Sequence, residues 1–367
     1  MEVGIIGLPK SGKTTIFNAL TKGKTAISAH HTATLAPHIG IAKVPDTRLT
    51  LIENTFHPKK TIPAEIKYVD IAGAPKEFGK GDTVGGQFLT HLMSADTLLQ
   101  VVRVFEDDEV PHIEGSIDPK RDITIFDLEL TMSDLTIIGR RLQKLDEALK
   151  GAKSPERELH LKEKALIEKL KSGLEKEIPI RQQGLSETEL KSLANYQFLT
   201  AKPMLILLNL GENQLSQVDS LEREIRSFYS HPQSEIVAAC GKLEMELAEL
   251  SDAEAKEFRH DLGLEESTLN RLVSLSYKLL GLISFFTTAS AELKAWTITN
   301  GTTALKAAGK IHSDMERGFI RAEVISFRDL ERMGNLAEAR KHGLLRTEGK
   351  NYIVQDGDII TFLFHTA

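Results

Sequence analysis

The chain has 367 residues, of which 41% are hydrophobic, and its formal net charge is −6. This composition supports a sizeable buried core, and it excludes the strongly basic surface of an electrostatic nucleic-acid binder. The single cysteine, Cys240, excludes a disulfide within the chain and favours a reducing compartment. We see no secretory leader and no membrane-spanning run, so we expect a cytoplasmic protein without a membrane partner.

Four short apolar runs predict strands that are buried on both faces of a parallel sheet, over residues 2–8, 66–72, 97–105 and 203–209. Helical patterns lie between these runs, which predicts an α/β doubly wound core. The third and fourth runs are separated by far more chain than one crossover needs. An inserted element is therefore expected between them.

Residues 7–14 read GLPKSGKT, a complete phosphate-binding signature between an apolar run and a helical one. Its glycines let successive backbone N–H groups point at phosphate oxygens, helped by the positive end of the helix. Lys13 would reach the β- and γ-phosphates, and the hydroxyl of Thr14 would bind Mg²⁺. We expect nucleotide contacts from Gly7, Pro9, Lys10, Ser11, Gly12, Lys13, Thr14 and Thr15.

A second magnesium-side element is predicted where an apolar run ends in the sequence DIAG. Asp70 would hold Mg²⁺ through water, and the N–H of Gly73 would sense the γ-phosphate. Thr34 is the best candidate to close over the metal and assist hydrolysis, with Thr32 as the alternative. Ala74 stands where many GTPases carry a water-orienting glutamine. We therefore expect slow hydrolysis unless another group positions the water.

His112, in the stretch EVPHIEG, is one candidate for that group. We expect it in a mobile loop, from which it could swing toward the nucleotide. An isolated loop histidine is more often a plain surface residue, so both interpretations stay open.

The fourth apolar run ends in Asn209-Leu210-Gly211-Glu212, where a GTPase would carry Asn-Lys-x-Asp. Glu212 sets its carboxylate further out, which should lose the paired hydrogen bonds that select guanine, and this favours ATP. Asn209 could donate to and accept from adenine, while Leu210 could cover the base. Backbone N–H groups at Cys240 and Gly241 would complete the base site, although Cys240 is more readily explained as a packing residue.

Residues 127–200 predict two long amphipathic helices that form an antiparallel hairpin, broken near Gly151–Pro155. The hairpin is either a solvated helix pair or an arm for a partner, and the sequence does not choose. Residues 282–367 predict a compact α+β binding module. The nucleotide-binding domain is then expected over residues 1–126 and 201–281.

The order of these motifs, with VRVFEDD before the insert and YIVQDGDIITF near the end, resembles the YchF-type Obg-like ATPases along the whole chain. The resemblance implies a Ras-like P-loop NTPase core, a coiled-coil hairpin and a TGS domain, which is a ubiquitin-like β-grasp. It also implies ATP preferred over GTP, slow Mg²⁺-dependent hydrolysis and potassium stimulation. Its expected partner is the ribosome, at the large subunit, with RNA contacts through the TGS domain. We expect a monomer.

The same resemblance places His112 on the histidine proposed to assist hydrolysis. The chain departs from the family pattern in the run HTATLAPHIG, at Ala74, and at Ala239–Gly241. Three hypotheses follow. The leading one is a slowly hydrolysing ATP switch in translation or stress regulation; the others are a GTPase with relaxed base specificity and a non-catalytic adaptor that nucleotide only stabilises.

Overall fold

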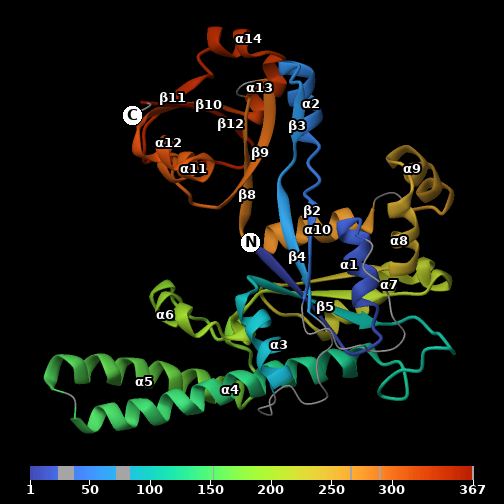
Figure 1. The fold of residues 1–367 in the computed structure, drawn as a ribbon, viewed down its shortest axis with the longest axis vertical. Coiled ribbons are helices and arrows are strands. Elements are labelled where there is room, and N and C mark those ends of the chain that lie inside the picture. Colours follow the sequence, from blue (N-terminus) through green and yellow to red (C-terminus); the bar gives the residue numbers. More distant parts are fainter. Residues whose placement is uncertain (24–36, 72–82, 152, 265–266, 289–290, 366–367) are drawn as a thin grey trace. The chain divides into compact units, whose positions relative to one another are not determined.

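The structure is a computed structural model, and it describes residues 1–23, 37–71, 83–151, 153–264, 267–288 and 291–365. Contacts divide the chain into two compact units (Figure 1). The first unit contains residues 1–41 and 67–269, and the second contains residues 42–66 and 270–367. Among the described residues, no helix is both long and apolar enough to cross a membrane.

The first unit is built on a six-stranded sheet with the order β2-β4-β1-β5-β6-β7. Strand β1 pairs in parallel with β4 and β5, and β5, β6 and β7 continue in parallel. Every residue of β5 and β6 is buried, which explains why their sequences are mostly apolar. The predicted α/β core is therefore confirmed. The strands are β1 (Glu2–Ile6), β2 (His38–Lys43), β4 (Glu65–Asp70), β5 (Thr97–Arg103), β6 (Met204–Asn209) and β7 (Ser234–Ala239).

Helices follow the strands of this sheet, as expected for a doubly wound core. Side chains from the sheet and from the helices around it form one large hydrophobic cluster. The helical segments are α1 (Lys13–Thr21), α3 (Thr83–Ser94), η4 (Glu212–Gln217), α7 (Val218–Phe228), α8 (Gly241–Glu249) and α9 (Asp252–Asp261).

A helical insertion separates β5 from β6, as the long gap between the two apolar runs predicted. Helices α4 (Pro119–Gly151) and α5 (Ser154–Leu174) lie side by side (Figure 1). Arg141 forms two hydrogen bonds of 2.7 and 2.8 Å to Glu163, and Lys164 forms one of 2.6 Å to Asp146. Short segments return the chain to β6: η1 (Ile180–Gln182), α6 (Glu187–Leu193), η2 (Ala194–Tyr196) and η3 (Leu199–Ala201).

The first helix of this insertion begins at Pro119, eight residues before the start expected from the apolar pattern. Its first turns carry Ile123, Phe126 and Leu130, which pack into the core of the first unit. Leu128 and Met132 belong to the apolar pattern that predicts this helix from sequence. They are nevertheless 53% and 55% exposed because this part of the helix turns its other face to the sheet. Helix α4 therefore belongs to the core at one end and to the hairpin at the other.

The second unit contains another six-stranded sheet, with the order β11-β10-β12-β8-β9-β3. Strand β12 pairs antiparallel with β10 and parallel with β8, and β8 pairs antiparallel with β9. Helix α11 contributes Ala304, Ala307 and Ala308 to the core of this unit. The remaining elements are α10 (Thr268–Leu279), β8 (Leu282–Thr287), β9 (Glu292–Thr299), α11 (Ala304–Ile311), α12 (Ser313–Arg317), β10 (Phe319–Ser326), α13 (Phe327–Met333), α14 (Leu336–Lys341), β11 (Arg346–Glu348) and β12 (Asp358–Phe364).

One segment groups differently from the domain division expected from sequence. Residues 42–66, which we placed in the nucleotide-binding domain, contribute helix α2 (Arg48–Phe56) and strand β3 (Lys60–Ile62) to the second unit. Strand β3 pairs in parallel with β9 at the sheet edge. Pairing between strands so distant in sequence leaves no local signal, so the apolar pattern did not reveal it.

Candidate functional site

The phosphate loop, residues Gly7–Thr14, connects β1 to α1. Gly7 has φ +147°, and a Cβ there would lie 2.3 Å from the carbonyl oxygen of Val101. Gly12 has φ +92°, and a Cβ there would lie 2.2 Å from Nδ2 of Asn209. Side chains at these two positions would therefore collide with the neighbouring strands. The glycines keep the loop tight and leave its backbone N–H groups available to an anion.

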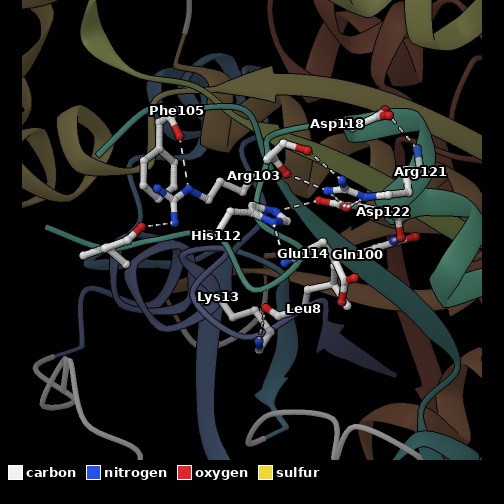
Figure 2. Close-up of polar contacts among 12 residues, drawn as sticks. Leu8, Lys13, Gln100, Arg103, Phe105, His112, Glu114, Asp118, Arg121 and Asp122 are labelled. Carbon is white, nitrogen blue, oxygen red and sulfur yellow. Dashed lines mark hydrogen bonds and ion pairs between the residues drawn. The ribbon is translucent and has the colours of Figure 1, made fainter. Parts of the chain in front are cut away.

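Lys13 folds its side chain back across this loop (Figure 2). Its ammonium group donates hydrogen bonds to the carbonyl oxygens of Gly7 at 3.0 Å and Leu8 at 2.9 Å. Burial lowers the pKa of Lys13 from 10.5 to about 8, opposed by the nearby negative charge of Asp70. A buried cation with no carboxylate bonded to it is a favourable partner for a phosphate group.

Thr14 and Asp70 are brought together at the carboxyl ends of β1 and β4. The hydroxyl of Thr14 donates a 2.9 Å hydrogen bond to Oδ2 of Asp70. Within the described residues, the buried Oδ1 of Asp70 and Oγ of Ser11 have no hydrogen-bond partner. His38, which the sequence analysis missed, places Nδ1 3.7 Å from Oδ2 of Asp70.

This donor set fits Mg²⁺. That ion usually binds one or two protein oxygens and takes its remaining ligands from phosphates and water. A hydroxyl, one carboxylate and an unpartnered carboxylate oxygen supply the protein part of such a set. The described residues contain no cluster of three or more acidic, histidine or cysteine side chains that would hold a metal without a phosphate.

Asn209 ties three parts of the site together. Its Nδ2 donates to the carbonyl oxygen of Ser11 at 2.9 Å, and its Oδ1 accepts from the N–H of Gly241 at 2.9 Å. The side chain is only 4% exposed. An amide has two N–H donors, so one remains for a base. The carbonyl oxygen, which we expected to accept from adenine, is already bonded within the protein.

The rest of the predicted base site is arranged differently from our expectation. Leu210 is 2% exposed and packs in the core, so little of it is available to cover a base. Glu212 is exposed and forms a 2.9 Å ion pair with Lys242, a residue that the sequence analysis did not select. Cys240 is buried against Leu243 and other apolar side chains, in agreement with a packing role. Burial also raises the pKa of its thiol.

His112 lies in the loop between β5 and α4, residues 104–118, which we call the His112 loop. Its Nε2 lies 2.9 Å from Oδ2 of Asp122, and its Nδ1 accepts a 3.1 Å hydrogen bond from the N–H of Glu114. An acceptor at Nδ1 places the ring proton on Nε2. The side chain is 5% exposed, so the expectation of a freely swinging or surface histidine was wrong.

Arg103 organises the same loop and was also missed. This buried residue donates to the carbonyl oxygens of Phe105 at 3.1 Å, Asp107 at 3.4 Å and Val110 at 2.6 Å. Its guanidinium lies 4.4 Å from the ring centroid of Phe105 (Figure 2). A sequence signal existed, since Arg103 interrupts an otherwise apolar run. A buried arginine needs several acceptors, and the loop carbonyls provide them.

Three predicted residues cannot be located in this site. They lie outside the described residues and are Thr34, its alternative Thr32, and Gly73. Ala74 also lies outside the described residues. Pro9, Lys10 and Thr15 lie on the phosphate loop and the first turn of α1, with Lys10 exposed at φ 64°. The described part of the site therefore consists of the phosphate loop, Asp70, the Asn209 region and the His112 loop.

Comparison with known proteins assigns the family. A family model described as "50S ribosome-binding GTPase" matches residues 2–134, and one named YchF-GTPase_C, described as "Protein of unknown function (DUF933)", matches residues 282–365. A Bacillus subtilis protein named "Ribosome-binding ATPase YchF" is 38% identical over 367 residues, covering 100% of this chain and 99% of that protein. The chain belongs to the YchF family. A Haemophilus influenzae YchF of the same name is 39% identical, with 99% of both chains covered.

A solved structure agrees with this assignment. The Schizosaccharomyces pombe YchF GTPase is 31% identical to this chain and superposes on it with a TM-score of 0.86. The match covers 99% of this chain and 97% of the Schizosaccharomyces pombe chain. The YchF fold therefore extends over both units and the helical insertion. The two family models lie on either side of the α4–α5 pair, which neither of them covers in full.

Proposed function

We propose that this chain is a ribosome-associated switch that binds ATP with Mg²⁺ in preference to GTP and hydrolyses it slowly. The relatives' printed name, "Ribosome-binding ATPase YchF", supports the partner, the nucleotide and the reaction. A ribosomal partner would also place the chain in the cytoplasm. The potassium stimulation and the large-subunit site stay predictions of the family resemblance, and the monomeric state stays an expectation from the sequence.

The observation that carries the proposal is the arrangement of Lys13, Thr14 and Asp70. A lysine with a lowered pKa lies beside a hydroxyl and a carboxylate that are 2.9 Å apart, and one carboxylate oxygen is unpartnered. When a magnesium–nucleotide complex binds, the ion would neutralise phosphate charge between Thr14 and Asp70. Lys13 would exchange its two loop carbonyls for phosphate oxygens, whose negative charge stabilises its charged form.

Preference for ATP is supported by the ion pair between Glu212 and Lys242. In a GTPase, the aspartate carboxylate at the position of Glu212 accepts two hydrogen bonds from guanine. Here Lys242 already neutralises that carboxylate at 2.9 Å, so guanine would have to displace an ammonium group. Adenine makes no such demand on a carboxylate. Each hydrogen bond that guanine fails to form weakens its binding by about 1–3 kcal/mol.

The α4–α5 pair and the second unit are proposed as the parts that engage the ribosome. We interpret α4–α5 as the coiled-coil hairpin and residues 282–367 as the TGS domain with its RNA contacts. The cross-helix pairs of Arg141 with Glu163 and of Lys164 with Asp146 support the hairpin. The helix α11 packed against a mixed sheet supports the β-grasp. The switch residues Thr34 and Gly73 would respond to the γ-phosphate.

The test is equilibrium binding of fluorescent ATP and GTP analogues with Mg²⁺, on the wild type, Glu212→Asp, Lys242→Met and Lys13→Ala. Because Leu210 belongs to the core, it is left unchanged. We expect the wild type to bind ATP more tightly. Lys242→Met should raise GTP affinity by about tenfold, since it frees Glu212 for guanine. Lys162→Met is the matched control, because it removes another exposed lysine that pairs with a glutamate, Glu158, at 2.8 Å.

Two other outcomes would replace the proposal. Tighter binding of GTP by the wild type would identify a GTPase, the activity printed for the Schizosaccharomyces pombe relative. ATP turnover equal to that of Lys13→Ala would identify a non-catalytic adaptor.

A further inference from the structure

We propose that Asp122 is the positioning residue of the hydrolytic reaction, acting through His112. The inference rests on the proposed function, slow hydrolysis of ATP, and on the expectation from the family resemblance that His112 assists it. It assigns a role to a carboxylate on the first turn of α4 that no sequence motif had singled out.

Asp122 is a fixed and buried group. Asp122 is only 2% exposed. Its backbone N–H donates to the carbonyl oxygen of Asp118 at 3.0 Å, and its backbone carbonyl accepts from Nε2 of Gln100 at 3.3 Å. Oδ1 accepts from Arg121 at 2.8 and 3.0 Å, which leaves Oδ2 for His112. The carboxylate is thus held by a helix, by strand β5 and by an arginine, as a positioning group requires.

The two ring nitrogens of His112 are held with different strength. Nε2 donates to a buried carboxylate at 2.9 Å, which is a charge-assisted bond. Nδ1 accepts from the N–H of Glu114 only two residues away, at 3.1 Å and in an exposed turn. Such a neutral local bond is weaker than a charge-assisted one. Opening this turn would free the lone pair of Nδ1 while Asp122 continues to hold the ring.

The His112 loop begins beside the phosphate loop. Strands β1 and β5 are parallel neighbours, with Ile6 opposite Gln100, so both loops leave the same edge of the sheet. A Cβ placed at Gly12 would lie 3.9 Å from Cε1 of Phe105, so the ring of Phe105 in the His112 loop lies near the phosphate loop. In Figure 2, Glu114, Leu8 and Lys13 are drawn below the imidazole of His112, and Asp122 is drawn beside it.

In the proposed step, the oxygen of a water molecule bonds to the γ-phosphorus of ATP. The bond between that phosphorus and the bridging oxygen breaks, and its electron pair stays on ADP. Nδ1 of His112 accepts the proton that the water loses and later returns it to phosphate or solvent. Asp122 keeps the proton of the neutral ring on Nε2, so that Nδ1 is the free base, and it stabilises the imidazolium that forms.

The experiment measures ATP turnover and ATP affinity of the full chain with Mg²⁺. The variants are Asp122→Asn, His112→Ala, the double variant and Lys13→Ala. We expect Asp122→Asn to lower kcat by tenfold or more, while the Kd for ATP changes less than threefold. Since Asp122 acts only through His112, the double variant should be no slower than His112→Ala. A general loss of structure would lower affinity and kcat together.

Asp134→Asn is the matched control, because Asp134 is a fully buried aspartate on the same helix that bonds to Leu199 and Thr200 and not to His112. It should retain wild-type kcat. Unchanged or increased turnover in Asp122→Asn would overturn the inference, as would losses that multiply in the double variant. If His112→Ala turns over ATP as fast as the wild type while Lys13→Ala is inactive, His112 has no role in hydrolysis. The proposed ATPase function would then stand and this inference would not. Wild-type turnover no higher than that of Lys13→Ala would overturn both proposals.

Discussion

The side chain of Asn209 and the backbone of Ser11 are joined by a 2.9 Å hydrogen bond across 198 positions of sequence. Because the same amide accepts from the N–H of Gly241, one residue holds the phosphate loop against the ends of β6 and β7. Asn209 is therefore a clamp for the site as well as a candidate contact for the base.

Asn209→Ala is expected to weaken ATP binding by more than tenfold and to lower the free energy of unfolding by about 2–4 kcal/mol, since a buried carbonyl and a buried N–H both lose their partner. Fluorescent ATP titration and urea unfolding measure the two effects. Asn213→Ala, an exposed asparagine in the following turn, is the control. Loss of stability with wild-type ATP affinity would show that the clamp does not shape the phosphate loop.

The lowered pKa of Lys13 predicts a pH dependence of ATP binding. In the ATP-free protein this pKa is about 8, and a bound phosphate raises it, so the complex holds more protons than the free protein above pH 8. ATP affinity should therefore be full below pH 8 and fall as pH rises toward 10. Titrations at several pH values measure this, and proton uptake on binding is measured by calorimetry in two buffers.

Lys13→Arg provides the comparison, because an arginine stays charged throughout this range. Whatever its affinity at pH 7, its ATP binding should change little between pH 8 and 10. An equally steep decline in this variant would assign the pH dependence to another group.

Arg48 is expected to stabilise the second unit, although it lies in a segment that the sequence assigned elsewhere. It donates to Asp356 at 2.8 Å, and Asp356 accepts from the N–H of Ser284 in β8. Arg48→Met should lower the free energy of unfolding of this unit by about 1–3 kcal/mol. Hydrogen exchange of the amides in β8 measures it, with exposed Arg328→Met as the control. Unchanged protection of β8 would contradict the role.

Asp134 predicts a second pH effect, on stability. Burial raises the pKa of its carboxyl to about 6, against hydrogen bonds from Thr200 and Leu199 that lower it. The folded chain therefore binds the proton more tightly than the unfolded chain, so this group's stabilisation is present below about pH 4 and is lost as pH rises through 6. The unfolding free energy of the wild type minus that of Asp134→Asn should therefore decrease as pH rises over that range. A constant difference from pH 4 to 7 would rule this out.

Sequence patterns were sufficient where the physical determinant is local. The phosphate loop is a contiguous stretch whose glycines and lysine define its geometry, and the fully buried strands β5 and β6 require mostly apolar residues. The α/β core, the inserted helices and the approach of Thr14 to Asp70 follow from the order of such stretches. The apolar pattern of α4 misled us only where the helix turns a different face to the core, at Leu128 and Met132.

The sequence by itself therefore determined the class of the core and the residues that meet phosphate. Only the tertiary structure decided which polar groups are paired: Glu212 with Lys242, Arg48 with Asp356, and His112 with Asp122. Such pairs have no periodicity and no fixed spacing, because a charged group can take its partner from any element that folding brings near. For that reason His112 looked like an isolated loop residue in the sequence and is a buried, hydrogen-bonded one in the fold.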